Sequence, residues 1–321
     1  MILLLSNTLD KSSVLISSWL ERLGASFLFL SEVDLYQECS LDIARNVLCV
    51  GGVDYSLEEF NSVWIRRPFS FHMTELYQHL QGQIDIDLGI LLREEVATIT
   101  RYLYTFLSMH SPYFLGNPSW HGTNKLVELK MAQEVGLNTP LMLVTTRKQD
   151  VVALVDRVGS IISKSLYNSR VIHPWDRSYE MYTHLVTRED LNALPDNFAP
   201  SLIQEAVAKE YDIRTFFLDG ELFSMAIVPD PSTEEVDFRR LETEQMRLLP
   251  IQLGDTISAK IRSFMERMGL KVGSLDLIKS TDGTIYFIEV NHEGIFSMVD
   301  GPCNYGIHKL IAEKLIGHDK R

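Results

Sequence analysis

The chain has few cysteines, and their spacing excludes two common kinds of site. Its 321 residues include only Cys39, Cys49 and Cys303, and no pair has the CxxC spacing of a zinc or thiol redox motif. Three such cysteines do not form a disulfide framework, so we expect buried thiols in a protein of the reducing cytoplasm.

Long apolar runs and a targeting signal are also missing. The opening MILLLSNT has only five apolar residues and no preceding basic segment, which predicts a first β-strand rather than a signal peptide. No window reaches the roughly 18 apolar residues of a membrane span. We therefore expect no membrane partner.

Positive charge is scarce. Lys and Arg number 30 against 43 Asp and Glu, giving a formal net charge of −13. Such a chain repels polyanions, so nucleic acid is not an expected partner, whereas a neutral or cationic peptide is accepted more easily. The 45% hydrophobic and 23% charged residues are typical of a globular protein long enough for two or three domains.

Glycine-rich phosphate loops are absent as well. No GxGxxG follows a predicted strand and no GxxxxGK[ST] occurs, so the motifs support neither a dinucleotide fold nor a P-loop. Instead the chain begins as a βαβ unit. We predict a small parallel-sheet domain closed by a long helix, from strands 2–5, 26–30, 46–50 and 62–65 and helices 11–23 and 88–109.

The remaining elements follow from caps, turns and apolar periodicity. A turn is expected at 115–118, and Thr123 or Asn124 caps a helix that ends at Gly136. Asp219-Gly220 predicts a hairpin turn. The further predicted elements are strands 140–145, 160–166, 202–207, 211–218 and 221–228, and helices 149–158, 256–268 and 306–315.

A second hairpin carries the first candidate site. Two apolar runs flank Asp282-Gly283, and a two-residue loop there sets Asp276 opposite Glu289, with Asn291 on the same face. Neither carboxylate has a lysine or arginine opposite it in this reading. Two facing carboxylates repel unless a cation lies between them, and this oxygen set suits Mg²⁺. The alternative is an ordinary hairpin whose acids face water.

Basic residues supply further candidates. Lys125 lies in the first turn of its helix, where it opposes the helix dipole; it either faces an anion or is solvated. Lys164 lies in the apolar strand Ile161-Ile162-Ser163-Lys164 and needs an anionic partner if buried.

Arginines occur in two pairs and on one hairpin strand. Trp64-Ile65-Arg66-Arg67-Pro68 presents a pair to an anion or peptide carboxylate, or simply to solvent. Asp237-Phe238-Arg239-Arg240 supplies a second pair, and Asp212 and Arg214 alternate onto one strand face.

The order and spacing of these residues resemble the ATP-grasp superfamily of carboxylate ligases. Three strings, those at 64–68, 237–240 and Phe287-Ile288-Glu289-Val290-Asn291, resemble more narrowly the graspetide (microviridin-type) peptide maturases. Pro302-Cys303-Asn304-Tyr305 is similar to the grasp-with-spasm branch. The resemblance implies an α/β, ATP-grasp fold: a pre-ATP-grasp parallel-sheet domain over 1–114, a central α/β domain over 115–201 and a C-terminal nucleotide and metal domain over 202–321.

The same resemblance implies a role for each candidate residue. Lys125 and Lys164 would contact the ATP phosphates and adenine, the adenine hinge would be Gln204, Glu205, Ala206 and Val207, and Asp212 would hold the ribose. The Mg²⁺ ligands would be Asp276, Glu289 and Asn291, and the residues that stabilise the γ-phosphate and acyl phosphate would be Arg214 with Arg239 or Arg240. The substrate contacts would be Arg66, Arg67, His292 and Glu293.

One departure from the family is plain. Pro-Asn-Gly or Pro-Val-Gly usually follows the metal-site Asn, whereas this chain has His292-Glu293-Gly294. Glu293 either adds a ligand or adapts the site to another nucleophile.

The implied reaction uses ATP and Mg²⁺ on a ribosomal precursor peptide with a leader. An Asp or Glu side chain becomes an acyl phosphate, and a Ser or Thr hydroxyl or a Lys amine then displaces phosphate to close an ester or amide ring. No enzyme nucleophile is required.

The substrate domain leaves alternatives open. The acidic, aromatic segment 176–190 is either a leader-docking surface or a solvated helix. An ATP-grasp ligase of small molecules would share every nucleotide residue, and a non-catalytic nucleotide switch is disfavoured because no metal ligand or phosphate lysine is lost. A homodimer is compatible with all three readings.

Overall fold

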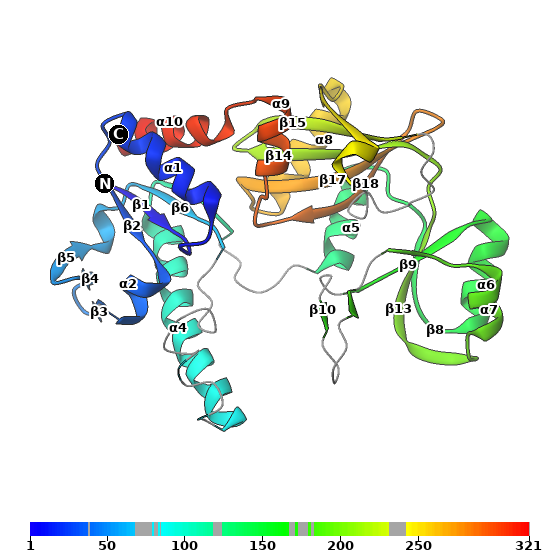
Figure 1. The fold of residues 1–321 in the computed structure, drawn as a ribbon, viewed down its shortest axis with the longest axis horizontal. Coiled ribbons are helices and arrows are strands. Elements are labelled where there is room, and N and C mark those ends of the chain that lie inside the picture. Colours follow the sequence, from blue (N-terminus) through cyan, green and yellow to red (C-terminus); the bar gives the residue numbers. More distant parts are fainter. Residues whose placement is uncertain are drawn as a thin grey trace. The chain divides into compact units, whose positions relative to one another are not determined.

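The computed structural model describes residues 1–37, 39–67, 79, 83, 85–117, 124–166, 171–172, 179–180, 183–230 and 242–320. They form two compact units (Figure 1). Unit 1 comprises Met1–Gly122, Leu270–Gly273 and His292–Arg321, and unit 2 comprises Thr123–Gly269 and Ser274–Asn291. Within the described ranges, no helix is both long and apolar enough to cross a membrane.

Unit 1 alternates short strands and helices. Its elements are β1 (Ile2–Leu5), α1 (Lys11–Arg22), β2 (Phe27–Leu30), α2 (Glu32–Gln37), β3 (Cys39–Asp42), β4 (Val47–Val50), β5 (Val53–Ser56), β6 (Ser62–Ile65), α4 (Ile86–His110), β7 (Tyr113–Leu115), α9 (Ser297–Cys303) and α10 (Ile307–Asp319).

A parallel sheet of order β2-β1-β6-β7 forms the centre of unit 1. Every residue of β1 and β6 is buried, as expected for a parallel strand covered on both faces. One face packs Leu3 and Leu5 against Leu103 and Leu107 of α4. Helix α10 contacts β1, β6, β7 and α1. The predicted parallel sheet is confirmed for strands β1, β2 and β6.

Several details of unit 1 differ from the sequence prediction. Strand β4 belongs to a separate antiparallel sheet, β3-β4-β5, and not to the parallel sheet. Helix α9 was not predicted, because Pro302 lies inside it and proline normally marks a helix boundary. Leu115, predicted in a turn, is the last residue of β7.

The described part of unit 2 carries a four-stranded sheet, a five-stranded sheet, a short two-stranded antiparallel ladder and four α-helices. Its elements are α5 (Lys125–Glu134), β8 (Met142–Arg147), α6 (Lys148–Val158), β9 (Ile161–Lys164), β10 (Val171–Ile172), β11 (Tyr179–Glu180), β12 (His184–Leu185), α7 (Arg188–Ala193), β13 (Asn197–Glu205), β14 (Lys209–Leu218), β15 (Glu221–Pro229), β16 (Met246–Ile251), α8 (Asp255–Arg267), β17 (Val272–Ser280) and β18 (Ile285–Asn291).

The smaller of these sheets has the order β12-β9-β13-β8. Val151 and Leu154 of α6 pack with Ile161 of β9 and Ile203 of β13 in one apolar cluster. This helix therefore covers one face of the sheet, as its buried stripe requires.

The larger sheet has the order β16-β15-β14-β17-β18. Asp219 and Gly220 join β14 to β15 with φ of 48° and 92°, and Leu218 pairs with Glu221. The predicted two-residue hairpin turn is confirmed, because both positions adopt the positive φ that such a turn needs.

The hairpin of β17 and β18 differs from its prediction in loop length and in the register next to the loop, but the predicted pairing of Asp276 with Glu289 is kept. Its loop has three residues, because Ser280 N donates to Thr284 O and Gly283 has φ of 89°. Lys279 therefore pairs with Ile285, one position from the predicted register. A β-bulge beyond Leu277 restores the register, so Asp276 does lie opposite Glu289.

The bulge places the apolar side chain of Phe287 and the carboxylate of Glu289 on opposite faces of the sheet. Phe287 pairs with Leu277 and packs on Phe264 of α8, with ring centroids 4.9 Å apart. Without the bulge, Phe287 and Glu289 would share one face. The extra residue, Ile288, lets Phe287 enter the core while Glu289 faces the other way.

The cysteines are free thiols, which agrees with the prediction of no disulfide framework. All three are half-buried rather than fully buried as expected. Burial raises the pKa of the Cys39 thiol, with smaller contributions from the charges of Cys49 and Asp34.

Candidate functional site

Three neighbouring strands of the larger sheet carry polar side chains on one face, which we call the polar face. Its members are Asp212 and Arg214 on β14, Ser274 and Asp276 on β17, and Glu289 and Asn291 on β18. The residues between them, Ile213, Leu275 and Val290, are buried apolar side chains. This alternation is the pattern of a sheet with one core face.

Arg214 and Asp276 form an ion pair across two strands. Arg214 Nη1 donates to Asp276 Oδ1 at 2.5 Å, with side chains only 10% and 21% exposed. The expectation that Asp276 faces no cation is therefore wrong. Arg214 Nε is buried and has no hydrogen-bond partner in the described part of the chain. An unsatisfied guanidinium N–H is costly to bury, which favours a ligand at this position.

Lys125 reaches the same hairpin from α5. Asn124 caps this helix by accepting from Leu126 N at 3.0 Å, as predicted. The cap places Lys125 in the first turn, where its Nζ lies 3.0 Å from Glu289 Oε2. The second hairpin carboxylate thus also has a cation beside it, which corrects the same expectation. The geometry explains why a lysine occupies an unfavourable helix position.

The donor set of the polar face fits a hard cation. Two carboxylates lie directly opposite each other, and Asn291 adds an amide oxygen on the same strand face. Oxygen ligands of this kind suit Mg²⁺, which commonly binds one or two carboxylates and shares its remaining positions with phosphates. Over the described residues, no group of three or more His, Cys, Asp and Glu forms a metal cluster.

The predicted ribose residue lies on the polar face but already has a partner. Asp212 is 8% exposed, and Lys209 Nζ lies 2.6 Å from its Oδ2. The sequence analysis did not single out Lys209. Its position three residues before Asp212 was the only signal, and that spacing does not bring two side chains together on a regular strand.

The predicted adenine hinge lies at the end of β13. Gln204 is buried, Glu205 N donates to Leu141 O and Ala206 N donates to Ser160 O, at 2.8 and 2.9 Å. Ala206 and Val207 lie in the short connection to β14.

Lys164 is half-buried at the end of β9, opposite Leu202 of β13. It therefore lies in the smaller sheet, on a strand beside the one that carries the hinge.

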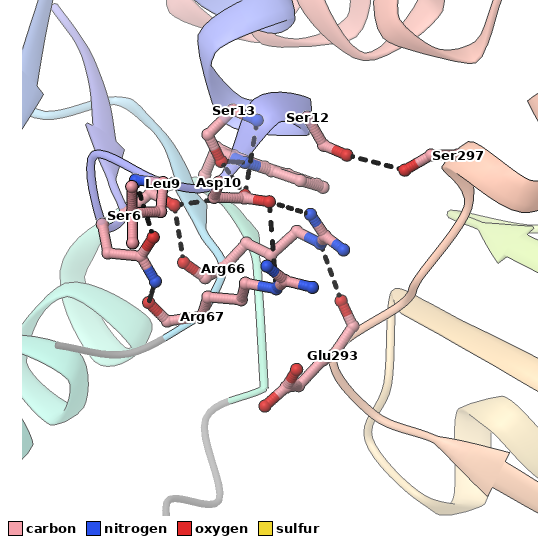
Figure 2. A network of polar contacts seen from close by, with 11 residues as sticks. Ser6, Leu9, Asp10, Ser12, Ser13, Arg66, Arg67, Glu293 and Ser297 are labelled. Atoms are coloured by element: carbon pink, nitrogen blue, oxygen red, sulfur yellow. Dashed lines mark hydrogen bonds and ion pairs between the residues drawn. The ribbon is translucent and has the colours of Figure 1, made fainter. Parts of the chain in front are cut away.

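The first arginine pair divides between interior and surface. Arg66 is 4% exposed, and its Nη1 donates to Asp10 Oδ1 at 2.5 Å (Figure 2). Burial lowers the pKa of the Arg66 guanidinium, while Asp10 acts in the opposite direction. The Arg67 side chain is 43% exposed, with its Nε 3.9 Å from Asp10 Oδ1. Arg67 has a left-handed φ of 49°, which turns successive side chains apart.

Asp10 was not among the predicted site residues. It is the N-cap of α1, and its Oδ2 accepts from Ser13 N and Ser13 Oγ at 3.3 and 2.7 Å. Capping was predictable from its place before a helix. The ion pair with Arg66, 56 residues away, left no local signal.

The departure from the family pattern lies in unit 1. His292 Nδ1 is 3.1 Å from Asn117 Nδ2. Glu293 is exposed, and its backbone carbonyl accepts from Arg66 Nε at 3.2 Å. Arg239 and Arg240 lie outside the described residues, as does part of segment 176–190.

No protein-family model and no curated protein matches the chain. Solved structures do match it, over nearly its whole length. The macrocyclase MdnC from Microcystis aeruginosa MRC, bound with precursor peptide MdnA, is 22% identical over 98% of this chain and 99% of that chain, with a TM-score of 0.79.

Two further structures are comparably similar. A RiPP-associated ATP-grasp ligase from Chryseobacterium gregarium, in complex with ADP and a leader and core peptide, is 21% identical over 98% of this chain and 96% of that chain (TM-score 0.82). The ATP-grasp ligase PsnB, with a phosphomimetic variant of its minimal precursor, Mg and ADP, is 19% identical over 99% and 98% (TM-score 0.81).

A small-molecule ligase is structurally more distant. D-alanyl-alanine synthetase A from Vibrio cholerae is 14% identical over 100% of this chain and 98% of that chain, with a TM-score of 0.59. Together the comparisons establish the fold: this chain has the α/β ATP-grasp fold predicted from its motifs.

Proposed function

We propose that the chain is an ATP-dependent ligase that closes rings in a ribosomal precursor peptide. It would join Asp or Glu side chains of the peptide to Ser or Thr hydroxyls, or to Lys amines. The fold supports this proposal, because three proteins that share it bind such peptides: MdnC a precursor peptide, PsnB a variant of its minimal precursor, and the Chryseobacterium ligase a leader and core peptide.

The observation that carries the proposal is the polar face. Beside the facing pair of Asp276 and Glu289, Arg214 has a buried Nε that finds no hydrogen-bond partner among the described residues. A preorganised guanidinium and a cation site are what phosphoryl transfer requires, because the protein contributes mainly positioning and charge neutralisation.

Different residues of the chain would bind different parts of the nucleotide and its metal. Asp276, Glu289 and Asn291 would hold Mg²⁺, which when bound neutralises phosphate charge. Lys125 and Lys164 would contact the phosphates and adenine. The other members of the nucleotide site would be the hinge residues Gln204, Glu205, Ala206 and Val207 and the ribose partner Asp212.

The chemistry has two steps. A peptide carboxylate attacks the γ-phosphorus of ATP, which forms an acyl phosphate and releases ADP. A hydroxyl or amine then attacks the acyl carbon, loses its proton and expels phosphate. Arg214, with Arg239 or Arg240, would stabilise the negative charge in both steps.

The peptide would contact other parts of the chain. Segment 176–190 is our proposed leader-docking surface. Arg67, His292 and Glu293 are proposed contacts of the core peptide, and Arg66 would position them.

We place the domain boundaries near residues 114 and 201. ATP, Mg²⁺ and three free cysteines fit a cytoplasmic enzyme, and a homodimer is compatible with the proposal.

Intact mass spectrometry of a co-expressed precursor tests the function. We expect the peptide to lose the mass of one water for each bond formed, and the enzyme to consume one ATP per bond. Loss of water from free amino acids or dipeptides, with no response to any leader-bearing peptide, would instead establish a small-molecule ligase.

A further inference from the structure

A short loop follows the last predicted metal ligand, and unit 1 holds it at several points. We call residues 292–296 the exit loop, because it begins directly after Asn291 at the end of β18. At its start, His292 contacts Asn117. Just beyond its end, Ser297 Oγ lies 3.1 Å from Ser12 Oγ of α1.

Arg66 contacts the exit loop at Glu293, as Figure 2 shows, and again at Phe296, the last residue of the loop. Its Nε donates to the backbone carbonyl of Glu293 at 3.2 Å. Its guanidinium carbon also lies 5.5 Å from the ring centroid of Phe296, within the range of a cation–π contact. One side chain therefore fixes the loop at two positions three residues apart.

Phe296 is held on other sides by aromatic side chains. It is fully buried, with Trp64 edge-on at 6.4 Å and His308 at 4.7 Å between ring centroids. His308 is itself fixed by Asp300, whose Oδ2 lies 2.6 Å from its Nδ1. The end of the exit loop is thus packed into the core of unit 1.

A buried arginine needs a compensating charge, and Asp10 supplies it. The two side chains are each 2% exposed and 2.5 Å apart. Asp10 is oriented by Ser13, whose Oγ donates to it at 2.7 Å and also accepts from Trp64 Nε1 at 2.9 Å. Apolar side chains would fill this space at a lower desolvation cost. The charged pair therefore suggests a role besides stability, and the bond to Glu293 supplies one.

We propose that Arg66 is a positioning residue, which holds the exit loop so that His292 and Glu293 are presented to the peptide substrate. Asp10 orients Arg66. Of the pair Arg66 and Arg67, only Arg67 would contact the peptide. This inference rests on the proposed function, because it concerns the loop that follows the metal-site strand. It replaces the sequence-based reading in which Arg66 itself binds a substrate anion.

The test needs variants that separate loop positioning from folding. Arg66→Met alone removes the close cation of buried Asp10, leaves only the more distant Arg67 beside it and destabilises the unit. The double variant Asp10→Asn/Arg66→Met removes both charges, and asparagine still caps α1. A second variant, Arg66→Lys, keeps the charge beside Asp10 but lacks the planar fork that also reaches Glu293.

Two measurements are made on each variant with the full chain. Hydrogen exchange with mass spectrometry follows the amides of residues 292–296, which we expect to exchange at least about tenfold faster because the loop opens locally. Ring formation is measured as kcat and as KM for ATP. We expect kcat to fall roughly 10- to 100-fold while KM for ATP stays within about twofold, as for misplaced but intact groups.

The matched control is Asp42→Asn/Arg45→Met, the same two changes in an exposed ion pair of unit 1 with a distance of 2.6 Å. It should leave both measurements unchanged. Unchanged exchange of residues 292–296 in both test variants would overturn the proposal, and so would faster exchange with wild-type kcat. If the wild-type enzyme closes no ring, the proposed function fails, yet the exchange data still report whether Arg66 holds the loop.

Discussion

At the scale of single residues, the two hairpin carboxylates already have cationic partners in unit 2. Asp276 accepts from Arg214 through Oδ1, and Glu289 faces Lys125 through Oε2. These pairs are compatible with a metal site, because an ionised carboxylate has two oxygens and about four acceptor positions. The two ion pairs also change the expected effect of neutralising a carboxylate, because substitution of Asp276 or Glu289 leaves Arg214 or Lys125 without its carboxylate partner.

Asp276→Asn and Glu289→Gln should each abolish ring formation, because each removes a negative charge proposed to face Mg²⁺. Asp276→Asn should also lower Tm by roughly 2–6 °C, since the nearly buried Arg214 loses a charged hydrogen bond. Glu289→Gln should lower Tm less, because Glu289 is 30% exposed. Thermal unfolding and intact peptide mass are measured together. Full activity in both variants would contradict the metal site.

Lys164→Ala should weaken ATP binding more than Lys125→Ala. Lys164 lies half-buried in an apolar strand, where an ammonium is more committed to an anion than at the first turn of a helix. Titration with a non-hydrolysable ATP analogue measures both affinities. Lys309→Ala, an exposed lysine paired with Glu313, is the control. The opposite ranking of the two test variants would contradict the assignment of Lys164.

At the scale of elements, local signals predicted most helices and the first hairpin. Asn124 caps α5, and Asp219 with Gly220 forms the turn between β14 and β15. Each of these depends on residues within one turn of the element. Caps and turns are therefore readable from the sequence alone.

The elements that the sequence did not predict depend on distant contacts. The bulge at Ile288 exists because Phe287 packs against Phe264 of α8. Arg66 binds Asp10, and then Glu293, which is 227 residues away. The candidate site was predicted in part: the facing carboxylates followed from strand pairing, but the cations beside them come from other elements.

The turn of the second hairpin can be tested by adding one methyl group. Gly283 has φ of 89°, so Gly283→Ala should destabilise the chain by about 1–2 kcal/mol through backbone strain. Gly317 lies exposed within α10 with open space around it. Gly317→Ala should therefore stabilise by about 0.5–1 kcal/mol. Denaturant unfolding measures both changes; equal signs would contradict the turn geometry.

At the scale of the whole molecule, the comparison with peptide ligases covers nearly the entire chain. MdnC is covered over 99% of its length and the Chryseobacterium ligase over 96%. The ATP-grasp fold therefore spans nearly the whole of this chain. Its net charge of −13 favours a substrate that is not itself strongly acidic outside the reacting carboxylates.

The leader should control the ATP reaction of the whole chain. We expect slow ATP hydrolysis by the enzyme alone and a clear rise when an intact precursor with its leader is added, because a docked peptide turns a random encounter into an oriented one. Core peptide without leader is the control substrate, and ADP release is measured beside peptide mass.

Arg214→Ala and Arg239→Ala should separate nucleotide binding from ring closure in the same assay. Both guanidinium groups are proposed to act on the acyl phosphate, so each variant should bind an ATP analogue yet lose the change in peptide mass. Arg101→Ala, on the exposed pair with Glu94 in α4, should behave as wild type. Wild-type mass loss in both test variants would contradict the arginine roles. A response to free amino acids instead of the precursor would place the chain with the small-molecule ligases.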